Sequence, residues 1–361
     1  MPIRQLSARG VRNLAPLVLL PHPRVNFIYG NNGSGKTSVL ESVHLLSSGK
    51  SFRTHQLKHI LNRDDDRLEV SIDLADSPDG EPGDSLYSLR LKNGDHLFRL
   101  NGSVLGSQAD AATRLPVLVI EPNTFKLLSG SPEERRQFMD WGVFHVEASF
   151  IEQWRTFRSL LKQRNAVLKQ KELEWLDVWN EGFIEAAEKI DDYRRDYLQR
   201  FKPEFDRTLK LLDPELEVGL SYYPGWEKNT PLADVLKKQA ERELQLGFTQ
   251  AGPHRAEIRI KSDKQNAADV LSRGQQKTVV AALKLAQGIL FKESTGSPPI
   301  YLVDDLASEL DGAHRLALCQ VLEDLKCQVF ITSIEKGQVL DTWQPAEYKV
   351  FHVEQGNVTE E

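Results

Sequence analysis

A glycine-rich loop is the feature that most limits how this chain can fold. Residues 30–37 read GNNGSGKT and match the phosphate-loop pattern G-x-x-x-x-G-K-[ST]. An apolar run at Val25, Phe27 and Ile28 precedes the loop, and residues 36–46 carry apolar side chains at helical spacing. This order of strand, loop and helix predicts an α/β fold that holds phosphates at the amino end of the helix. Phosphate loops serve kinases, GTPases, transporters, helicases and DNA-repair proteins, so the loop alone leaves the function open.

The composition is that of a globular protein outside the membrane. Of the 361 residues 40% are hydrophobic and 27% are charged, and eighteen uncharged apolar residues never occur together. The first ten residues contain no apolar run for export, and the two cysteines, Cys319 and Cys327, lack metal-ligand spacing. We therefore expect a cytoplasmic protein in a reducing compartment.

Strand patterns occur in both halves of the chain. Residues 68–74 alternate apolar and polar side chains, and residues 86–102 predict a hairpin whose turn is Asn93-Gly94, a pair suited to positive φ angles. The unbroken apolar run over 115–122 is typical of a buried parallel strand. Further strands are expected over residues 256–260, 299–305, 327–333 and 347–356.

Between these strands, residues 150–201 have helical periodicity. One apolar stripe includes Trp154 and Phe157, and a second runs from Trp175 through Trp179 to Phe201. The second stripe predicts a helix roughly 40 Å long at about 1.5 Å per residue. We expect an antiparallel pair of helices, with the tryptophans in its core rather than stacked on nucleic-acid bases.

Three more motifs follow in a fixed order. LSRGQ at 271–275 begins a helix, IYLVDD at 300–305 is an apolar strand that ends in Asp304 and Asp305, and the segment after it contributes Ser308 and Asp311. Taken alone, LSRGQ could merely cap a helix. The whole series of phosphate loop, L-S-x-G-Q, paired carboxylates and S-x-L-D resembles the ATP-binding-cassette (ABC) ATPases.

The spacing resembles one branch of these ATPases. Lys36 and Ser272 are 236 positions apart, which leaves room for the helical pair and resembles the heads of SMC-type proteins, although the insert is too short for an SMC arm. The segments GKSFRT (49–54), LLSGSPEERRQFMD (127–140) and FTQAGPHR (248–255) resemble the RecF family of bacterial recombination mediators, from Leu6 to Val353. Asn123 departs from the acid that this family usually has after its proline, which leaves one loop contact in question.

The resemblance implies an SMC-like ABC-ATPase head of α/β class with an inserted helical-hairpin arm. We expect the head to comprise residues 1–122 and 248–361, and the arm to comprise residues 123–247. By the same resemblance, the expected nucleotide-binding residues are Gly30, Asn31, Asn32, Gly33, Ser34, Gly35, Lys36, Thr37, Ser38, Arg12, Ser272, Gly274 and Gln275. ATP and Mg²⁺ are the expected cofactors.

The roles of the phosphate-loop residues follow from their chemistry. Backbone N–H groups of residues 31–37 should surround the β-phosphate, and Lys36 should reach the β- and γ-phosphate oxygens. Thr37 and Asp304 are the expected Mg²⁺ ligands. Asp305 stands where most ABC ATPases have a glutamate as the general base, and the shorter side chain predicts slow hydrolysis. Asp305 could instead be a structural acid.

Three further positions have alternatives. Glu121 ends a buried strand where the resemblance places a loop that positions Mg²⁺ or water, and it could also be an edge carboxylate. The usual switch histidine is absent after residues 329–333, so Thr332 or Ser333 would sense the γ-phosphate. Arg12 resembles an arginine that contacts the nucleotide in SMC-type heads, and a solvated surface arginine is the alternative.

The signature helix implies a dimer. In this superfamily, residues at the positions of Ser272, Gly274 and Gln275 contact the γ-phosphate held by a partner subunit, where the helix dipole favours an anion. Ser308 and Asp311 would line the same interface. Loss of the γ-phosphate then opens an ATP-dependent homodimer.

Basic residues suggest a DNA surface despite a net charge of −6. Residues 1–60 hold eight lysines and arginines against one acid, Glu41, and a second row of basic residues lies on one face of the first long helix. The candidate DNA contacts are Lys50, Arg53, Lys58, Arg155, Arg158 and Lys162. A solvated helix face is the alternative for the second row. By resemblance, the dimer would bind duplex DNA beside single-stranded gaps and promote recombinase loading with RecO- and RecR-type partners, using weak, DNA-stimulated ATP hydrolysis as its switch.

Two other classes of function share part of this set of motifs. An ATPase coupled to transport, or a purely structural head, would share the nucleotide motifs, but transporter ATPases lack the helical insert and the GPHR segment. A small-molecule kinase has no need of LSRGQ.

Overall fold

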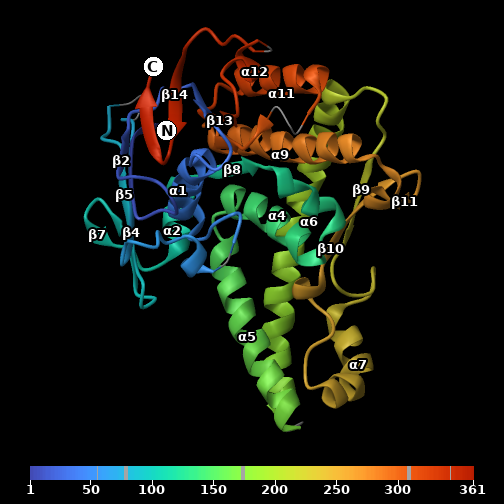
Figure 1. Ribbon diagram of the computed structural model, residues 1–361. Helices are drawn as coiled ribbons and strands as arrows, with labels where there is room; N and C mark the ends of the chain where they lie inside the picture. The colour runs from blue at the N-terminus through green and yellow to red at the C-terminus, as the bar shows by residue number, and fades with distance from the viewer. Residues whose placement is uncertain (55, 77–79, 172–174, 307–309, 342) are drawn as a thin grey trace. The chain divides into compact units, whose positions relative to one another are not determined.

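The strand that leads into the phosphate loop lies inside a six-stranded sheet in the computed structural model (Figure 1). The strand order is β15-β14-β3-β13-β12-β8, and the four neighbouring pairs from β14 to β8 are parallel. The strands are β3 (Val25–Tyr29), β8 (Val117–Ile120), β12 (Ile300–Val303), β13 (Val329–Ser333), β14 (Tyr348–Glu354) and β15 (Asn357–Glu360). β12 and β13 are buried along their whole length, as strands covered on both faces are. Four of the strands predicted from apolar runs are thereby confirmed.

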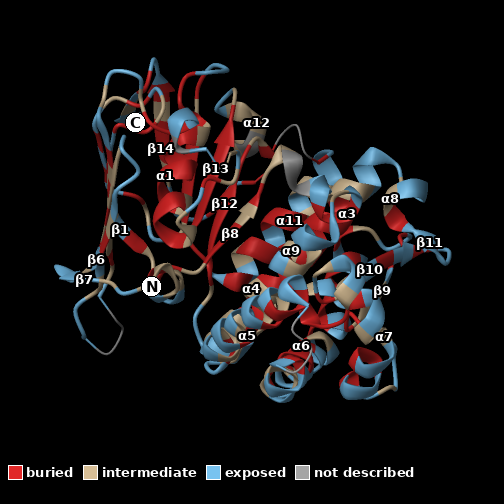
Figure 2. Ribbon diagram, turned by 90° about the horizontal axis from the view of Figure 1, so that it is seen from below, coloured by how far each residue is buried: buried red, intermediate tan, exposed pale blue. Residues whose placement is uncertain are grey.

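Helix α1 (Lys36–Ser48) follows the phosphate loop and packs between the parallel sheet and a second, antiparallel sheet (Figure 2). The second sheet has the order β2-β1-β4-β5-β6-β7, formed by β1 (Ile3–Arg9), β2 (Leu17–Leu19), β4 (Arg67–Leu74), β5 (Ser85–Leu91), β6 (His96–Leu100) and β7 (Ser103–Val104). Its inward side chains alternate with outward ones, as in β4, where Leu68, Val70 and Ile72 are buried. One hydrophobic core therefore joins α1 to both sheets.

The predicted turn of the β5–β6 hairpin needs a correction. Residues 92–95 connect these strands, and of the pair Asn93-Gly94 only Gly94 has a positive φ, at 97°. The two-residue turn with both φ angles positive is the next one, at Asn101 (49°) and Gly102 (81°) between β6 and β7. Both dipeptides suit a left-handed turn, so local sequence could not tell which one closes the tight hairpin.

The structure describes residues 1–361 except 55, 77–79, 172–174, 307–309 and 342, so Ser308 lies outside the described residues. The chain forms two units: the first comprises residues 1–124, 211–214 and 281–361, and the second comprises residues 125–210 and 215–280. Both sheets described above belong to the first unit. The arm and head boundaries at residues 122 and 247 stay predictions.

The second unit contains an antiparallel helix pair, α5 (Phe150–Gln170) and α6 (Leu176–Leu212), as the sequence predicts. Ring contacts join Phe150 to Tyr193 and Phe157 to Phe183, so residue numbers rise along α5 as they fall along α6. With 37 residues, α6 is about 55 Å long, more than predicted, because the buried stripe continues past Pro203.

The tip of the helix pair departs from the prediction. Trp175 and Val178, expected in the apolar stripe, are 57% and 63% exposed. They lie at or just before the first turn of α6, beside the end of α5. Few α5 side chains remain there for the apolar stripe of α6 to pack against. Trp154 and Trp179 are partly buried, as expected of core residues at a packed helix pair.

The remaining elements complete the two units. A three-stranded sheet of the second unit has the order β11-β10-β9, formed by β9 (Gly219–Tyr223), β10 (Glu257–Ser262) and β11 (Gln265–Asn266); β10 is the strand predicted over 256–260. The other helices are α2 (Gln108–Arg114), α3 (Lys126–Ser129), α4 (Pro132–Val146), α7 (Leu232–Leu246), α8 (Ala267–Val270), α9 (Arg273–Thr295), α11 (Gly312–Leu325) and α12 (Gly337–Leu340), with single turns at η1 (Leu57–His59), η2 (Pro122–Phe125) and η4 (Pro253–Arg255). Among the helices of the described residues, none combines the length and the apolar character needed to cross a bilayer.

A fully buried ion pair holds the helix pair to α7. The side chains of Arg164 and Glu243 are both 0% exposed, and their Nη2 and Oε2 atoms are 2.7 Å apart. Arg164 also donates to Asn180 Oδ1 (2.8 Å) and Thr249 Oγ1 (2.7 Å), and its guanidinium lies over the Phe183 ring. The guanidinium can be buried because its donors have partners on α6, α7 and the following loop.

Replacement of Arg164 tests this network. We expect Arg164→Met to lower the free energy of unfolding by about 3–5 kcal/mol, because it leaves the Glu243 carboxylate buried without its cation. Arg158→Met, an exposed change on the same helix, should alter it by less than about 0.5 kcal/mol. Urea unfolding of both variants measures the difference, and equal midpoints would contradict the assigned role of the buried pair.

Candidate nucleotide-binding site

The phosphate loop connects β3 to α1, and its backbone requires glycine at two positions. Gly30 has φ of 153° and Gly35 has φ of 121°. A Cβ atom at Gly30 would lie 2.2 Å from the backbone oxygen of Val353, so a larger residue cannot fit there. The resulting loop ends at the first turn of α1, where the helix dipole and unpaired N–H groups favour an anion.

Lys36 is held inside this loop. Its Nζ atom donates to the carbonyl oxygens of Gly30 (2.6 Å) and Asn31 (3.0 Å), and the residue is only 8% exposed. Burial lowers the pKa of Lys36, although the nearby carboxylates of Asp304 and Asp305 act in the opposite direction. A buried ammonium group in this position matches a ligand that brings negative charge.

A second polar group in the loop also fits a phosphate. The Oγ atom of Ser34 is buried and has no hydrogen-bond partner among the described residues. A buried hydroxyl without a partner is costly, and a phosphate oxygen would satisfy it. The loop therefore offers both a cation and an unsatisfied donor to a bound phosphate.

Two carboxylates stand at the end of β12, beside α1. The carboxylate of Asp304 accepts hydrogen bonds from Thr37 Oγ1 (3.0 and 3.1 Å) and from Thr332 Oγ1 (2.7 Å). Burial raises the pKa of Asp304, while these hydroxyl donors oppose the rise. A hydroxyl and a carboxylate side by side are oxygen ligands suited to Mg²⁺, which usually completes its shell with substrate phosphates and water. The described residues contain no cluster of three or more His, Cys, Asp or Glu that could hold a metal without such help.

Asp305 has an unusual backbone conformation. Its φ is 53°, in the left-handed region, and its N–H donates to Thr332 Oγ1 at 2.8 Å. Left-handed backbone at a non-glycine residue costs energy and is concentrated at functional sites. The Thr332 hydroxyl therefore bonds both the carboxylate of Asp304 and the backbone of Asp305, and Ser333 donates instead to the carbonyl of Glu335. The sequence predicts that Thr332 or Ser333 senses the γ-phosphate; the Thr332 hydroxyl bonds Asp304 and the Asp305 N–H, and the sensor role stays a prediction.

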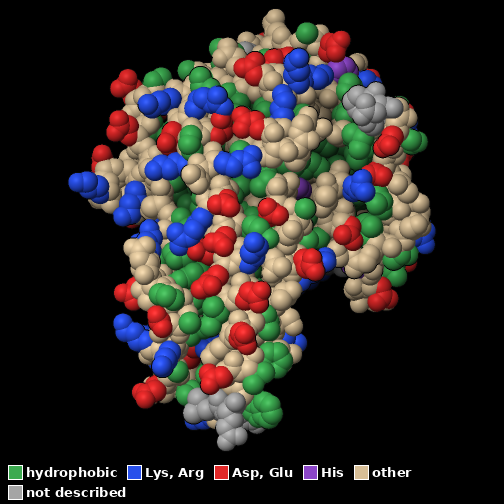
Figure 3. All heavy atoms as spheres, turned by 180° about the vertical axis from the view of Figure 1, so that it is seen from behind, with side chains coloured by type: hydrophobic (Ala, Val, Ile, Leu, Met, Phe, Trp, Pro, Cys, Tyr) green, Lys and Arg blue, Asp and Glu red, His purple; other side chains and the backbone are tan. Residues whose placement is uncertain are grey.

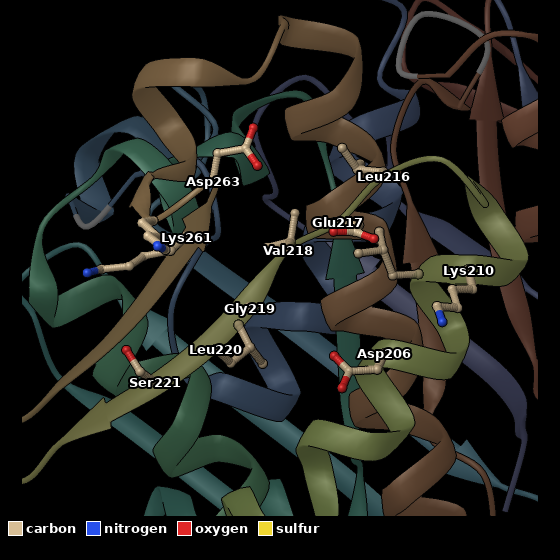
Figure 4. Close-up of a pocket in the computed structure, with 12 residues that line it drawn as sticks. Asp206, Lys210, Leu216, Glu217, Val218, Gly219, Leu220, Ser221, Lys261 and Asp263 are labelled. Carbon is tan, nitrogen blue, oxygen red and sulfur yellow. The ribbon is translucent and has the colours of Figure 1, made fainter.

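These groups line one hollow of about 480 Å³ in the first unit. Its lining residues are Arg12, Asn13, Asn32, Gly33, Gly35, Lys36, Thr37, Ser38, Arg53, Pro122, Asp304, Asp305 and Ile334. A larger hollow of about 620 Å³ lies in the second unit beside β9, but its charged side chains do not converge: Lys210 and Lys261 are on opposite sides of it (Figure 4). Convergent polar groups, not size, make the first hollow the candidate site.

Two arginines of the hollow share one buried acid. The Glu41 side chain is 0% exposed, and it accepts hydrogen bonds from Nε and Nη2 of Arg12, while Arg53 Nη1 lies 4.0 Å away. Arg12 is therefore anchored rather than freely solvated. Arg53, predicted to contact DNA, lies at the nucleotide hollow and is 46% exposed, and its DNA role stays a prediction. From the sequence, Glu41 is only an isolated acid among basic residues; its place on the helix that follows the loop, five residues after Lys36, is the signal that it lies near the site.

Glu121 is partly buried at the carboxyl end of β8, directly before Pro122, which lines the hollow. This position is compatible with the predicted role in positioning Mg²⁺ or water, which stays a prediction.

The signature residues form an exposed helix start in the second unit. Ser272 Oγ accepts from the Gln275 N–H (3.3 Å), and Gln275 Oε1 accepts from the Ser272 N–H (2.9 Å). This reciprocal pair is a capping box, and it starts α9 where the sequence predicts. Ser272, Gly274 and Gln275 are exposed, so their outward groups can meet a partner molecule. Asp311 likewise caps α11 and accepts from the N–H groups of Ala313 and His314.

The candidate DNA residues are mostly exposed. Lys50 and Lys58 are exposed in the first unit, and Arg155, Arg158 and Lys162 are exposed along α5. On the face seen in Figure 3, acidic and basic side chains are interspersed rather than gathered by sign. The exposure of these five residues is compatible with phosphate contacts, and their DNA role stays a prediction.

Comparison with known proteins shows the family to which the chain belongs. Residues 2–359 match the family described as "RecF/RecN/SMC N terminal domain". The DNA replication and repair protein RecF of Stutzerimonas stutzeri (strain A1501) is 45% identical over 365 residues, which cover 100% of this chain and 98% of that protein. A solved structure described as "recombination mediator protein RecF-ATPrS in RecFOR pathway" aligns with TM-score 0.85 and 25% identity over 99% of this chain and 97% of that chain. A second, described with "RecF-ATP", aligns with TM-score 0.87 and 24% identity over 100% and 97%.

The fold and the site define an ATPase head of the ABC class, in the form shared with SMC proteins. Within that class, the chain belongs to the RecF family of DNA replication and repair proteins.

Thr332→Val tests how the two carboxylates are held. The change keeps the shape of the side chain but removes the hydroxyl that bonds Asp304 and the Asp305 N–H. We expect the ATPase kcat to fall at least about fivefold, because an unsatisfied buried group costs roughly 1–3 kcal/mol. Thr332→Ser restores the hydroxyl and should recover most of the rate. Steady-state ATPase assays on both variants measure this, and equal rates for valine and serine would contradict the role of the hydroxyl.

Proposed function

We propose that this protein is an ATP-driven switch that binds duplex DNA during recombinational repair. The observation that carries the proposal is the exposure of the signature residues: they form an exposed helix start in the second unit, whereas the phosphate loop and its carboxylates line a hollow of the first unit. An exposed helix start is suited to a phosphate presented by another molecule, because the helix dipole favours an anion there. A second copy of the chain, carrying ATP in its own loop, meets this requirement.

Mg²⁺ would be held by Thr37 and Asp304 together with phosphate oxygens, and it would neutralise the charge that develops on the transferred phosphate. Asp305 would orient the attacking water. The hydroxyl of Thr332, which bonds Asp304 and the Asp305 N–H, ties the metal ligand to the base. Since Asp305 is shorter than the usual glutamate, we expect slow turnover that serves as a timer for dimer opening.

The DNA and protein partners belong to the same proposal. RecF-family membership favours DNA repair over transport as the work that the ATPase performs. A solved relative is described within a RecFOR pathway, which supports mediators of the RecO and RecR kind as partners of this chain too. We propose that the dimer binds duplex DNA beside single-stranded gaps, mainly through its phosphates.

A complementation experiment tests the shared nucleotide site. With ATP and Mg²⁺, the wild-type chain should elute as a dimer in size-exclusion chromatography, whereas Lys36→Met and Ser272→Arg should each remain monomeric. An equimolar mixture of the two variants should regain a dimer, because one intact loop then faces one intact signature. Lys58→Met and Ser297→Arg repeat the charge changes at exposed positions and should dimerise normally. Dimers of Lys36→Met alone would refute the shared site.

Salt dependence tests the basic row on α5. We expect duplex binding to require ATP, and the double change Arg158→Ala/Lys162→Ala to reduce the slope of log K against log salt by roughly 2, about one for each lost phosphate contact. Lys237→Ala/Lys238→Ala removes two exposed charges from α7 and should leave the slope unchanged. Fluorescence anisotropy at several salt concentrations measures both slopes. Identical slopes would make the α5 row a solvated helix face.

A further inference from the structure

The turn between β14 and β15 contacts the phosphate loop directly. Gln355 and Gly356 form this turn, with φ angles of 48° and 83°. The N–H of Gly356 donates to the carbonyl oxygen of Ser34, at 2.8 Å, in the middle of the phosphate loop. The two segments are more than 300 positions apart in the sequence, so no local pattern predicts the contact.

This contact controls the direction of a neighbouring N–H group. In a trans peptide, the C=O of one residue and the N–H of the next point in opposite directions. The Ser34 oxygen is bound to Gly356, on the side of the loop that faces the β14–β15 turn. The N–H of Gly35 must therefore point to the other side, and Gly35 is one of the residues that line the hollow with Lys36 and Asp304.

The same turn holds a second segment of the site. The carbonyl oxygen of Gly356 accepts from the N–H of Ala15 at 3.0 Å. Next to Ala15, the Asn13 side chain donates to the Gly33 carbonyl (2.8 Å) and accepts from Ser38 Oγ (3.2 Å). The turn, the segment around Asn13 and the phosphate loop are thus fixed to one another by four hydrogen bonds.

We propose that Gly356 and Asn13 are positioning residues for nucleotide binding: they orient the phosphate-loop peptides, and in particular the Gly35 N–H, toward the phosphates. This inference rests on the proposed ATP-binding function and adds the β14–β15 turn to the nucleotide site. Asn13 lines the hollow and Gly356 does not, and both bond the loop through its carbonyl groups: Asn13 through that of Gly33, and Gly356 through that of Ser34. A loop orientation fixed before binding lowers the cost of ordering it.

Glycine is required at 356 for two separable reasons. Its left-handed backbone disfavours a side chain, and a Cβ atom there would lie 2.0 Å from the backbone oxygen of Asn13. Gly102 provides a matched comparison. It has nearly the same φ, 81°, in a hairpin turn, but a Cβ atom at Gly102 would meet nothing within 4 Å. Gly102→Ala therefore adds backbone strain alone. Gly356→Ala adds the same kind of strain and also a clash with the Asn13 carbonyl, so the turn must be displaced from the segment around Asn13.

The test compares Gly356→Ala with Gly102→Ala. Titration calorimetry with MgADP should show an affinity at least about tenfold weaker for Gly356→Ala, in line with the loss of one charge-assisted hydrogen bond, and an unchanged affinity for Gly102→Ala. In ATPase assays, KM should rise by a similar factor while kcat changes less than about twofold. A purely structural defect would lower the active fraction, and with it kcat, at constant KM.

A second variant covers the case in which Gly356→Ala unfolds at a much lower temperature than Gly102→Ala. Asn13→Ala removes two side-chain hydrogen bonds without a steric clash, and it should raise KM with a wild-type melting temperature. Wild-type KM and ADP affinity in a folded Gly356→Ala or in Asn13→Ala would overturn the inference. A wild-type chain that shows no heat with MgADP would instead count against the proposed ATP-binding function.

Discussion

A buried cation inside a glycine loop is the constraint on which the nucleotide site depends. Lys36 is 8% exposed and is bonded by two backbone carbonyls, and burial lowers its pKa. In the same hollow, burial raises the pKa of Asp304. Each charge is costly alone in this environment, and a metal-bound triphosphate offers a partner to both. The surrounding sheet and α1 keep these groups in place before the ligand arrives.

We propose that the work of ATP binding is divided between separate pieces of chain. The loop, its carboxylates and the Arg12–Glu41 pair belong to the first unit, whereas the capping box of Ser272 and Gln275 belongs to the second. Within the capping box, each side-chain oxygen accepts from the backbone N–H of the other residue, so the box is already paired within its own helix. The helix start is exposed and favours an anion, so we propose that it binds the nucleotide held by a second molecule.

Local patterns were sufficient for the parts of the site that lie close together in the sequence. The phosphate loop, the strand before it, the helix after it and the start of α9 all depend on neighbours within a few residues, and the sequence predicted each of them. The same holds for the antiparallel helix pair, whose apolar stripes are long.

Local sequence could not predict which turn closes the tight hairpin. The dipeptides Asn93-Gly94 and Asn101-Gly102 both suit a left-handed turn, and the strand register decides between them. Contacts such as Thr332 with Asp304, or Glu41 with two arginines, form only when distant strands and loops pack, so composition and spacing could not reveal them.

If two chains share each triphosphate, the nucleotides must be bound by pairs of chains, and the number of nucleotides per assembly reveals this. Native mass spectrometry in the presence of a non-hydrolysable ATP analogue and Mg²⁺ measures that number for intact particles. With a shared site, we predict a particle of two chains that carries two nucleotides, and we expect nucleotide-free chains to remain monomeric. Monomers that each carry one nucleotide at saturating analogue would contradict it.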